Sequence, residues 1–284
     1  MLIDLQLHST CSDGYLTPTE LAQECKKRNI KVASLTDHNT VSGQEEFFRA
    51  CRKANIKTVA GMELYVKLGH RHFNMLWYNL DIENPELHNL LRDSQSRRRA
   101  NVRKALERLA RLRYAINTDL DSFSHYIPLN RIVDEFYALN KERLRKELGK
   151  KNIIEPELVR YYFRSKEKTF LHESYIDFNR IAKLKKNIGG QFVLAHPCRY
   201  IWLREDKVAE LKQLGIDGVE VLSPHHSWGA VSYLQALTDQ YKLIMSGGSD
   251  FHRFEEERWY RIKSSWNYFE INSKLLKGVE KIIG

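Results

Sequence analysis

The chain has 284 residues, of which 42% are hydrophobic, so it is long enough for one barrel-sized domain with an insertion and a buried core. It has no run of about 18 apolar residues and Asp4 interrupts its first apolar run, so we expect neither a membrane span nor a signal peptide. The formal net charge of +10 favours partners that carry negative charge.

Strands and helices alternate in the first part of the chain. A capping-box pattern at Thr17–Glu20, with Pro18 at the first helical position, opens a helix that runs to about Arg28. Ser42–Glu45 repeats the pattern and opens a helix that ends near Asn55. This alternation favours an α/β fold. The strands expected here are Leu2–Leu7, Lys31–Leu35, Thr58–Ala60, Glu63–Val66 and Arg71–Tyr78.

The pattern becomes helical after Pro85, and strand alternation is not evident there. We therefore expect a helical insertion, or cap, at 82–187 between two parts of a barrel domain at 1–81 and 188–284. Its expected helices are Arg97–Leu112, Arg131–Leu139, Lys141–Leu148 and Pro156–Phe163.

Alternation of strands and helices returns after Gly189-Gly190, which marks a helix stop and a turn. The expected strands are Gln191–Ala195, Gly218–Leu222 and Lys242–Ser246. The expected helices are 204–214, 229–240 and a closing helix at 274–283.

Most of the positive charge lies in the middle of the chain. Residues 92–151 contain sixteen Lys or Arg against eight Asp or Glu. Such an excess attracts polyanions such as nucleic acid, although a charge run is more often a solvated helix face. The four cysteines form no C-x-x-C pair, which suits free thiols in a reducing cytosol, so we expect a cytoplasmic protein.

Six short blocks contain His, Asp or Glu, and most of them follow an apolar run that is typical of a strand. Ligands at the carboxyl ends of strands are how a β/α barrel assembles a site from distant residues. Imidazoles mixed with carboxylates suit Mn, Zn or Fe. One such His is usually structural, but six blocks together indicate one metal site. The blocks are Leu5–Gly14, Thr36–Asn39, Gly61–Glu63, His70–His72, Ala195–Pro197 and Ser249–His252.

The order of these blocks resembles the PHP (polymerase and histidinol phosphatase) superfamily of metal-dependent phosphoesterases. Within it, Ala195–Tyr200 and Gly218–Val221 resemble the branch of 5′-to-3′ exoribonucleases and nucleoside 3′,5′-bisphosphate phosphatases. The motifs cover residues 1–80 and 188–252, and the middle resembles that branch only loosely. The resemblance implies a distorted (β/α)7 barrel with the helical insertion over its active-site mouth.

The resemblance also implies two or three divalent metal ions per chain, Mn, Fe or Zn, with Glu63 as a bridging ligand. Glu63, His196 and Asp250 are the expected catalytic residues. The family has a His where this chain has Gln6, and a neutral amide is a weaker ligand, so occupancy of that position stays open. The ligands that the resemblance assigns are Gln6, His8, Asp13, His38, Glu63, His72, His196, Asp250 and His252.

Several of these residues have a structural alternative. His72 could face solvent on its strand, and His70 would share its face. His38 could cap a turn through Asn39. Asp37 is expected to shape its loop rather than bind metal.

Two residues are expected to bind substrate. Arg199 follows a ligand by three positions, and its fork suits phosphate oxygens, although a surface ion pair is the alternative. The resemblance places His226 near substrate, while His225 has no such support. Three aromatic residues could stack on a base or pack in the core: Tyr200, Trp202 and Trp228.

These observations predict a metal-dependent phosphoesterase that acts on nucleotides or short RNA. The first alternative is a small-molecule phosphatase like the histidinol-phosphate branch. The second is a non-catalytic binding protein whose metal site has decayed, and Gln6 is the feature that favours it. The expected partner is the nucleotide or RNA substrate, and no obligate protein partner or membrane is expected.

Overall fold

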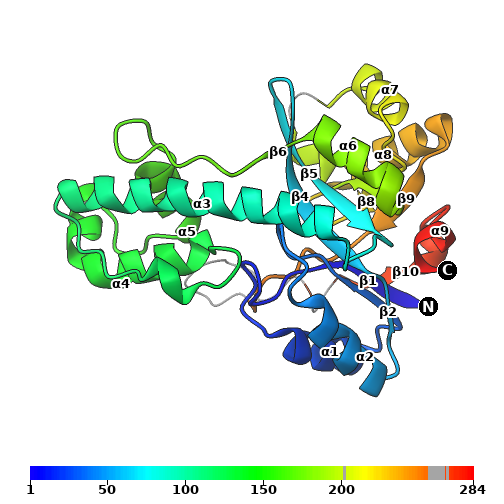
Figure 1. Ribbon diagram of the computed structural model, residues 1–284, viewed down its shortest axis with the longest axis horizontal. Coiled ribbons are helices and arrows are strands. Elements are labelled where there is room, and N and C mark those ends of the chain that lie inside the picture. The colour runs from blue at the N-terminus through cyan, green and yellow to red at the C-terminus, as the bar shows by residue number, and fades with distance from the viewer. Residues whose placement is uncertain (201–202, 255–265, 267–268) are drawn as a thin grey trace. The chain divides into compact units, whose positions relative to one another are not determined.

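The computed structural model describes residues 1–200, 203–254, 266 and 269–284 (Figure 1). Trp202 lies outside the described residues. The chain divides into two compact units. The first contains Met1–Leu91, Tyr175–Arg253 and Ser265–Gly284, and the second contains Arg92–Ser174 and Phe254–Ser264, a segment of which only Phe254 is described. Among the described helices, none has the length and apolar character needed to span a membrane.

The strands of the first unit form two sheets. The smaller has the order β10-β1-β2-β3, and the larger has the order β6-β4-β5-β7-β8-β9. Parallel pairs dominate, as expected for an α/β fold, while β4 and β5 form an antiparallel hairpin. The strands are β1 (Leu2–Leu7), β2 (Val32–Leu35), β3 (Lys57–Thr58), β4 (Gly61–Leu68), β5 (Arg71–Tyr78), β6 (Ile176–Asp177), β7 (Gln191–Leu194), β8 (Gly218–Leu222), β9 (Ile244–Gly247) and β10 (Ile271–Asn272).

Two isolated parallel bridges join the two sheets. Leu7 pairs with Phe251, just beyond β9, and His38 pairs with Glu63 in β4. The strands β1, β2, β4, β5, β7, β8 and β9 therefore follow one another around the unit. In the described part of the chain, both seams consist of isolated bridges instead of continuous ladders. The predicted α/β fold is confirmed, and the seams bring the ends of β1, β2, β4 and β9 together.

Helices cover the outer faces of these sheets. Thr17 closes a capping box with Glu20 at the start of α1, as its pattern predicts. Leu21 of α1 and Phe47 of α2 are fully buried with Leu35 of β2 in one cluster. The helices of this unit are α1 (Pro18–Lys27), α2 (Gln44–Lys53), α6 (Phe178–Ile188), α7 (Glu205–Gln213), α8 (Trp228–Tyr241) and α9 (Glu280–Ile283).

The second unit is helical and has its own apolar core, in which Leu109, Val133, Phe136 and Phe163 are buried. Its helices are α4 (Leu129–Leu148), α5 (Glu155–Leu158) and the larger part of α3 (Pro85–Arg111), with a π-helical turn at Val159–Phe163. In Figure 1 these elements lie together in the green part of the ribbon.

Two helices differ from the sequence prediction. α3 begins at Pro85, well before Arg97, because the Asn84 side chain accepts hydrogen bonds from the first backbone N–H groups of the helix. α4 is continuous where two helices were expected, because Asn140 is buried and its side chain bonds to Ala115 and to the Phe136 carbonyl. The polar residue thus joins helical segments instead of separating them.

Two further differences lie in the first unit. β6 and α6 are part of it, although they fall within the insertion expected at 82–187, because Phe178 and Ile181 pack in its core. The insertion's limits, and its role as a cap, stay predictions. The expected closing helix at 274–283 is a short 3-10 turn followed by α9, since Gly278 interrupts it with a φ of 79°.

Candidate metal centre

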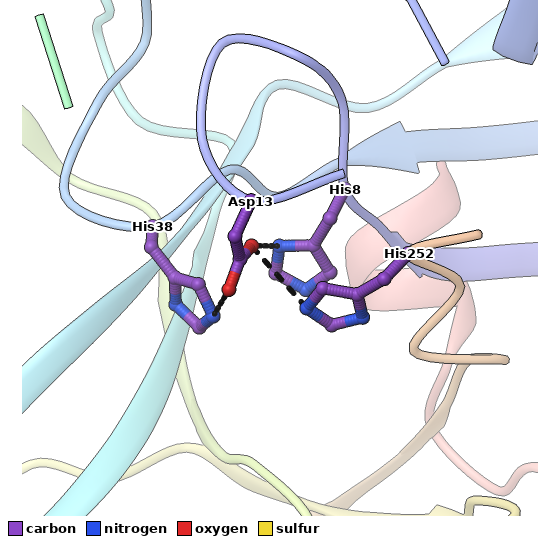
Figure 2. A group of neighbouring side chains, drawn as sticks. All are labelled: His8, Asp13, His38 and His252. Carbon is purple, nitrogen blue, oxygen red and sulfur yellow. Dashed lines mark ion pairs between the residues drawn. The ribbon is translucent and has the colours of Figure 1, made fainter. Parts of the chain in front are cut away.

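Four side chains that follow the ends of strands lie together in one cluster (Figure 2). We call it the Asp13 group, and its members are His8, Asp13, His38 and His252. Oδ1 of Asp13 lies 3.8 Å from Nδ1 of His8 and 3.3 Å from Nε2 of His252. Its Oδ2 lies 3.6 Å from Nε2 of His38. Figure 2 shows the three imidazoles pointing toward this carboxylate.

The loop that carries Asp13 is held by a second carboxylate. Asp37 accepts hydrogen bonds from the backbone N–H of Ser9 at 2.7 Å and from its hydroxyl at 2.6 Å. Gly14 ends the turn, where a Cβ atom would come within 2.1 Å of the His8 carbonyl oxygen. Asp37 therefore shapes the loop, as its sequence position suggests, and only glycine fits the close approach.

A second group, which we call the Glu63 group, shares His8 with the first and adds two buried carboxylates, Glu63 and Asp250. Nε2 of His8 lies 3.1 Å from Oε2 of Glu63 and 3.2 Å from Oδ1 of Asp250. Oε2 of Glu63 is buried, and Nδ1 of His38 also lies 3.5 Å from it. A buried carboxylate needs positive charge beside it, which a protonated imidazole or a bound cation supplies.

His196 approaches Glu63 from the end of β7. Its Nε2 lies 3.0 Å from Oε1 of Glu63. The backbone of His196 has a φ of 27°, which is costly for a residue with a side chain, and its N–H donates to the buried Oε2 of Glu220 at 2.6 Å. Glu220 thus supports the conformation that aims His196 at Glu63.

The structure corrects the expectation for His72. His72 is exposed on β5 and stacks on Tyr175, and it is in neither metal group of the described residues. Asn74 is the residue of this strand that reaches the centre, since its Nδ2 donates to Oε1 of Glu63 at 2.9 Å. The two residues lie on the same face of β5, so strand alternation did not distinguish them.

Gln6 is fully buried on β1, two residues before His8 and on the same face of the strand. Neither its amide oxygen nor its amide nitrogen has a hydrogen-bond partner in the described part of the chain. A buried amide without a partner costs free energy, so a ligand or water is expected to satisfy it. Its role as a ligand stays a prediction.

Charges in the cluster are strongly coupled. Burial alone would raise the pKa of Glu63, but the imidazoles of His38 and His196 hold it well below its usual range. Burial alone would lower the pKa of His8, but the carboxylates of Asp250 and Glu63 raise it. The carboxylates are therefore ionised, and their buried charge needs protonated imidazoles or metal cations beside it.

Besides Asn74, sequence reasoning missed two contributors, His225 and Glu220. His225 has an imidazole nitrogen 2.8 Å from Oδ2 of Asp250, so it borders the Glu63 group. Only the spatial position of its loop reveals this contact. Burial raises the pKa of Glu220 well above its usual range, and Asp250 adds to the effect. The Gly218–Val221 motif contains Glu220 but did not reveal its bond to His196.

The expected substrate residues occupy different environments. Arg199 is exposed on the 3-10 turn Pro197–Arg199 that follows His196. His226 is half-buried, and its Nδ1 lies 2.9 Å from the Val221 carbonyl oxygen. The ring of Tyr200 is half-buried and its hydroxyl lies 3.3 Å from Nδ1 of His196, whereas Trp228 is exposed.

These donor sets fit divalent cations. Imidazole nitrogens and carboxylate oxygens are the ligands that Mn, Fe and Zn accept together. The Asp13 group offers three imidazoles and one carboxylate, and the Glu63 group offers one imidazole and two carboxylates. The geometry therefore supports the predicted metal chemistry, while the metal's identity is not determined by it.

Comparison with known proteins gives a consistent result. The family described as PHP domain matches residues 4–163. A 5′-3′ exoribonuclease of Haemophilus influenzae is 27% identical over 253 residues, which cover 88% of this chain and 89% of that protein. A 3′,5′-nucleoside bisphosphate phosphatase of Chromobacterium violaceum is 25% identical over 263 residues, covering 88% of this chain and 87% of that protein.

A solved structure supports the fold. It is a Bifidobacterium adolescentis protein assigned as a metal-dependent phosphoesterase, with a TM-score of 0.76 and 21% identity. The match covers 88% of this chain and 87% of the other. It shows that the arrangement of strands and helices around the candidate centre is one that other proteins share.

Proposed function

Because this chain belongs to the PHP domain family, we propose that it is a metal-dependent phosphoesterase that hydrolyses phosphate esters of nucleotides or short RNA. The observation that carries the proposal is the convergence of the Asp13 and Glu63 groups in one buried cluster. The named activities of the exoribonuclease and bisphosphate phosphatase relatives support the substrate class.

In this proposal the Asp13 group and the Glu63 group would each hold one cation. A third cation beside His196 would compete with Asn74, which already donates a hydrogen bond to Oε1 of Glu63. The side-chain amide of Asn74 is neutral, so it would give that cation no anionic ligand. The buried amide of Gln6 likewise adds no charge.

When bound, divalent cations supply positive charge that stabilises the phosphoryl transition state and promotes ionisation of the attacking water. The chain's own side chains supply the ligands and the orientation of the groups around them. Glu63 and Asp250 keep their negative charge and hold the centre together. His196 presents Nε2 to Glu63, and Tyr200 and Glu220 fix the orientation of its ring, so it helps to hold the Glu63 carboxylate in place.

Arg199 is the residue proposed to hold a phosphate that is not cleaved. It is exposed and follows His196 by three residues, so a phosphate in the site lies within reach of its flexible side chain. The basic excess in residues 92–151 is proposed to attract the remainder of a polyanionic substrate.

A side-by-side kinetic panel tests this function. Short oligoribonucleotides and a nucleoside 3′,5′-bisphosphate should be hydrolysed faster than histidinol phosphate or p-nitrophenyl phosphate by the full chain supplied with Mn²⁺, and chelation should abolish turnover. Faster turnover of histidinol phosphate would support the small-molecule phosphatase instead. Metal binding without hydrolysis of any substrate would support a binding protein, the alternative that Gln6 and Asn74 favour.

A further inference from the structure

A row of aromatic rings leads away from the metal centre along the β4–β5 hairpin. The ring of His38, a member of the Asp13 group, stacks on Tyr65 with centroids 4.5 Å apart and an interplanar angle of 17°. Tyr65 meets Tyr175 edge-on at 6.1 Å. Tyr175 stacks on His72 at 4.1 Å, with an angle of 18°. Two half-buried tyrosines thus connect a metal-centre residue with an exposed histidine.

Strand register explains why these residues share one face. Side chains alternate along a strand, so Glu63, Tyr65 and Lys67 point to the same side of β4. His72 lies directly opposite Lys67 in the antiparallel pairing. The exposed cation of Lys67 therefore lies beside the outer end of the row, on the face that carries Glu63 to the metal centre.

Aromatic rings combined with a nearby cation are the means by which proteins hold single-stranded nucleic acid without reading its sequence. Every base has a π-face that can stack, while the cation pairs with the phosphate backbone. Here the row begins at the metal centre and ends at the surface.

We infer that His72, Tyr175 and Tyr65 form a subsite for the nucleobases of a single-stranded oligonucleotide whose scissile phosphate lies at the metal centre. Lys67 faces the backbone of this oligonucleotide. The inference rests on the proposed function and narrows its substrate class to a chain of several nucleotides. It also gives His72 a role in stacking, separate from metal binding.

A binding experiment tests the subsite without relying on turnover. The full chain loaded with Mn²⁺ is titrated into a fluorescent RNA pentamer with hydrolysis-resistant phosphorothioate linkages, and anisotropy gives the Kd. His72→Ala and Tyr175→Leu should each weaken binding by about tenfold, the scale of losing one stacked base. His72→Phe should retain wild-type affinity, because phenylalanine stacks but cannot bind a metal.

The matched control is His70→Ala, which removes an exposed histidine at the turn of the same hairpin and should leave the Kd unchanged. Pentamers with one abasic residue at each position in turn provide the second arm. One of these abasic pentamers should bind the wild type about tenfold more weakly than the intact pentamer does. His72→Ala should not weaken the binding of that abasic pentamer further.

Equal weakening of intact and abasic pentamers by His72→Ala and Tyr175→Leu would overturn the subsite, since it would show that the rings only support the hairpin. Unchanged binding in both variants would overturn it as well. These failures are separate from failure of the proposed function. If the proposed function fails, the wild type hydrolyses no phosphate ester, whether or not its binding of RNA depends on His72.

Discussion

Asn74 donates a hydrogen bond from Nδ2 to Oε1 of Glu63 at 2.9 Å. The same Glu63 oxygen also faces Nε2 of His196. A third cation beside these two residues would need an anionic or imidazole ligand, and the amide of Asn74 is neither. We therefore expect the number of bound cations to depend on this residue.

Replacing Asn74 with His should raise the metal content from two to three cations per chain. An imidazole there can bind a cation together with Glu63 and His196, whereas the amide donates to Glu63. Elemental analysis after loading with Mn²⁺ and gel filtration measures the ratio. Asn74→Ala is the matched control and should stay at two. Three cations in the wild type would contradict the assignment.

Glu63→Gln or His196→Ala should lower phosphoesterase turnover by more than about a hundredfold, the scale on which enzymes lose a preorganised charge-stabilising group. Glu63 contacts His8, His38 and His196, so its charge organises the whole centre. Initial rates on the best substrate of the panel, with circular dichroism to confirm folding, provide the measurement. His70→Ala serves as the control, and near-normal turnover in both site variants would place the chemistry elsewhere.

Arg199→Ala should lower kcat/KM for a nucleoside 3′,5′-bisphosphate more than for p-nitrophenyl phosphate. Only the first substrate has a second phosphate for the guanidinium to hold. Arg204→Ala removes a nearby exposed arginine whose side chain pairs with Asp206, and it should affect neither substrate. The Arg199 effect should diminish as salt is raised. An equal loss on both substrates would mean that Arg199 does not select for the second phosphate.

Glu147→Gln should destabilise the helical unit at pH 7. Oε2 of Glu147 accepts hydrogen bonds from the hydroxyls of Tyr114 and Tyr162 at 2.7 and 2.9 Å, and Oε1 accepts one from Arg143 at 2.7 Å. Loss of the charge should lower the free energy of unfolding by about 1 kcal/mol, measured by denaturant titration. Glu142→Gln, at a side chain that is 86% exposed, should have almost no effect.

The effect of Glu147 should depend on pH. Burial would raise the pKa of this carboxyl, but its hydrogen bonds with Tyr114, Arg143 and Tyr162 lower it from the ordinary 4.5. A carboxyl whose pKa is lower in the folded state stabilises the fold above pH 4.5, and the contribution is lost as pH falls through the folded-state pKa. The difference in stability between wild type and Glu147→Gln should therefore shrink in acid. A constant difference down to pH 2 would show that ionisation of Glu147 is not the cause.

Local sequence determined much of this protein. Apolar runs followed by His, Asp or Glu predicted β1, β2 and β9 and the side chains that meet in the two groups at their ends, because alternation and strand-end position are local properties. The capping box at Thr17 predicted the start of α1 for the same reason. The order of the motifs also predicted the family before any contact between distant residues was known.

Only the tertiary structure decided which residues of β5 and of the β8–α8 loop reach the centre. His72 and Asn74 share one face of β5, and each step of two residues moves a side chain about 7 Å along the strand. The pairing of Glu63 with Leu76 puts Asn74 beside the carboxylate and leaves His72 at the surface. His225 reaches Asp250 because their two loops meet in space. Register and loop packing depend on contacts between distant segments, and local pattern does not contain them.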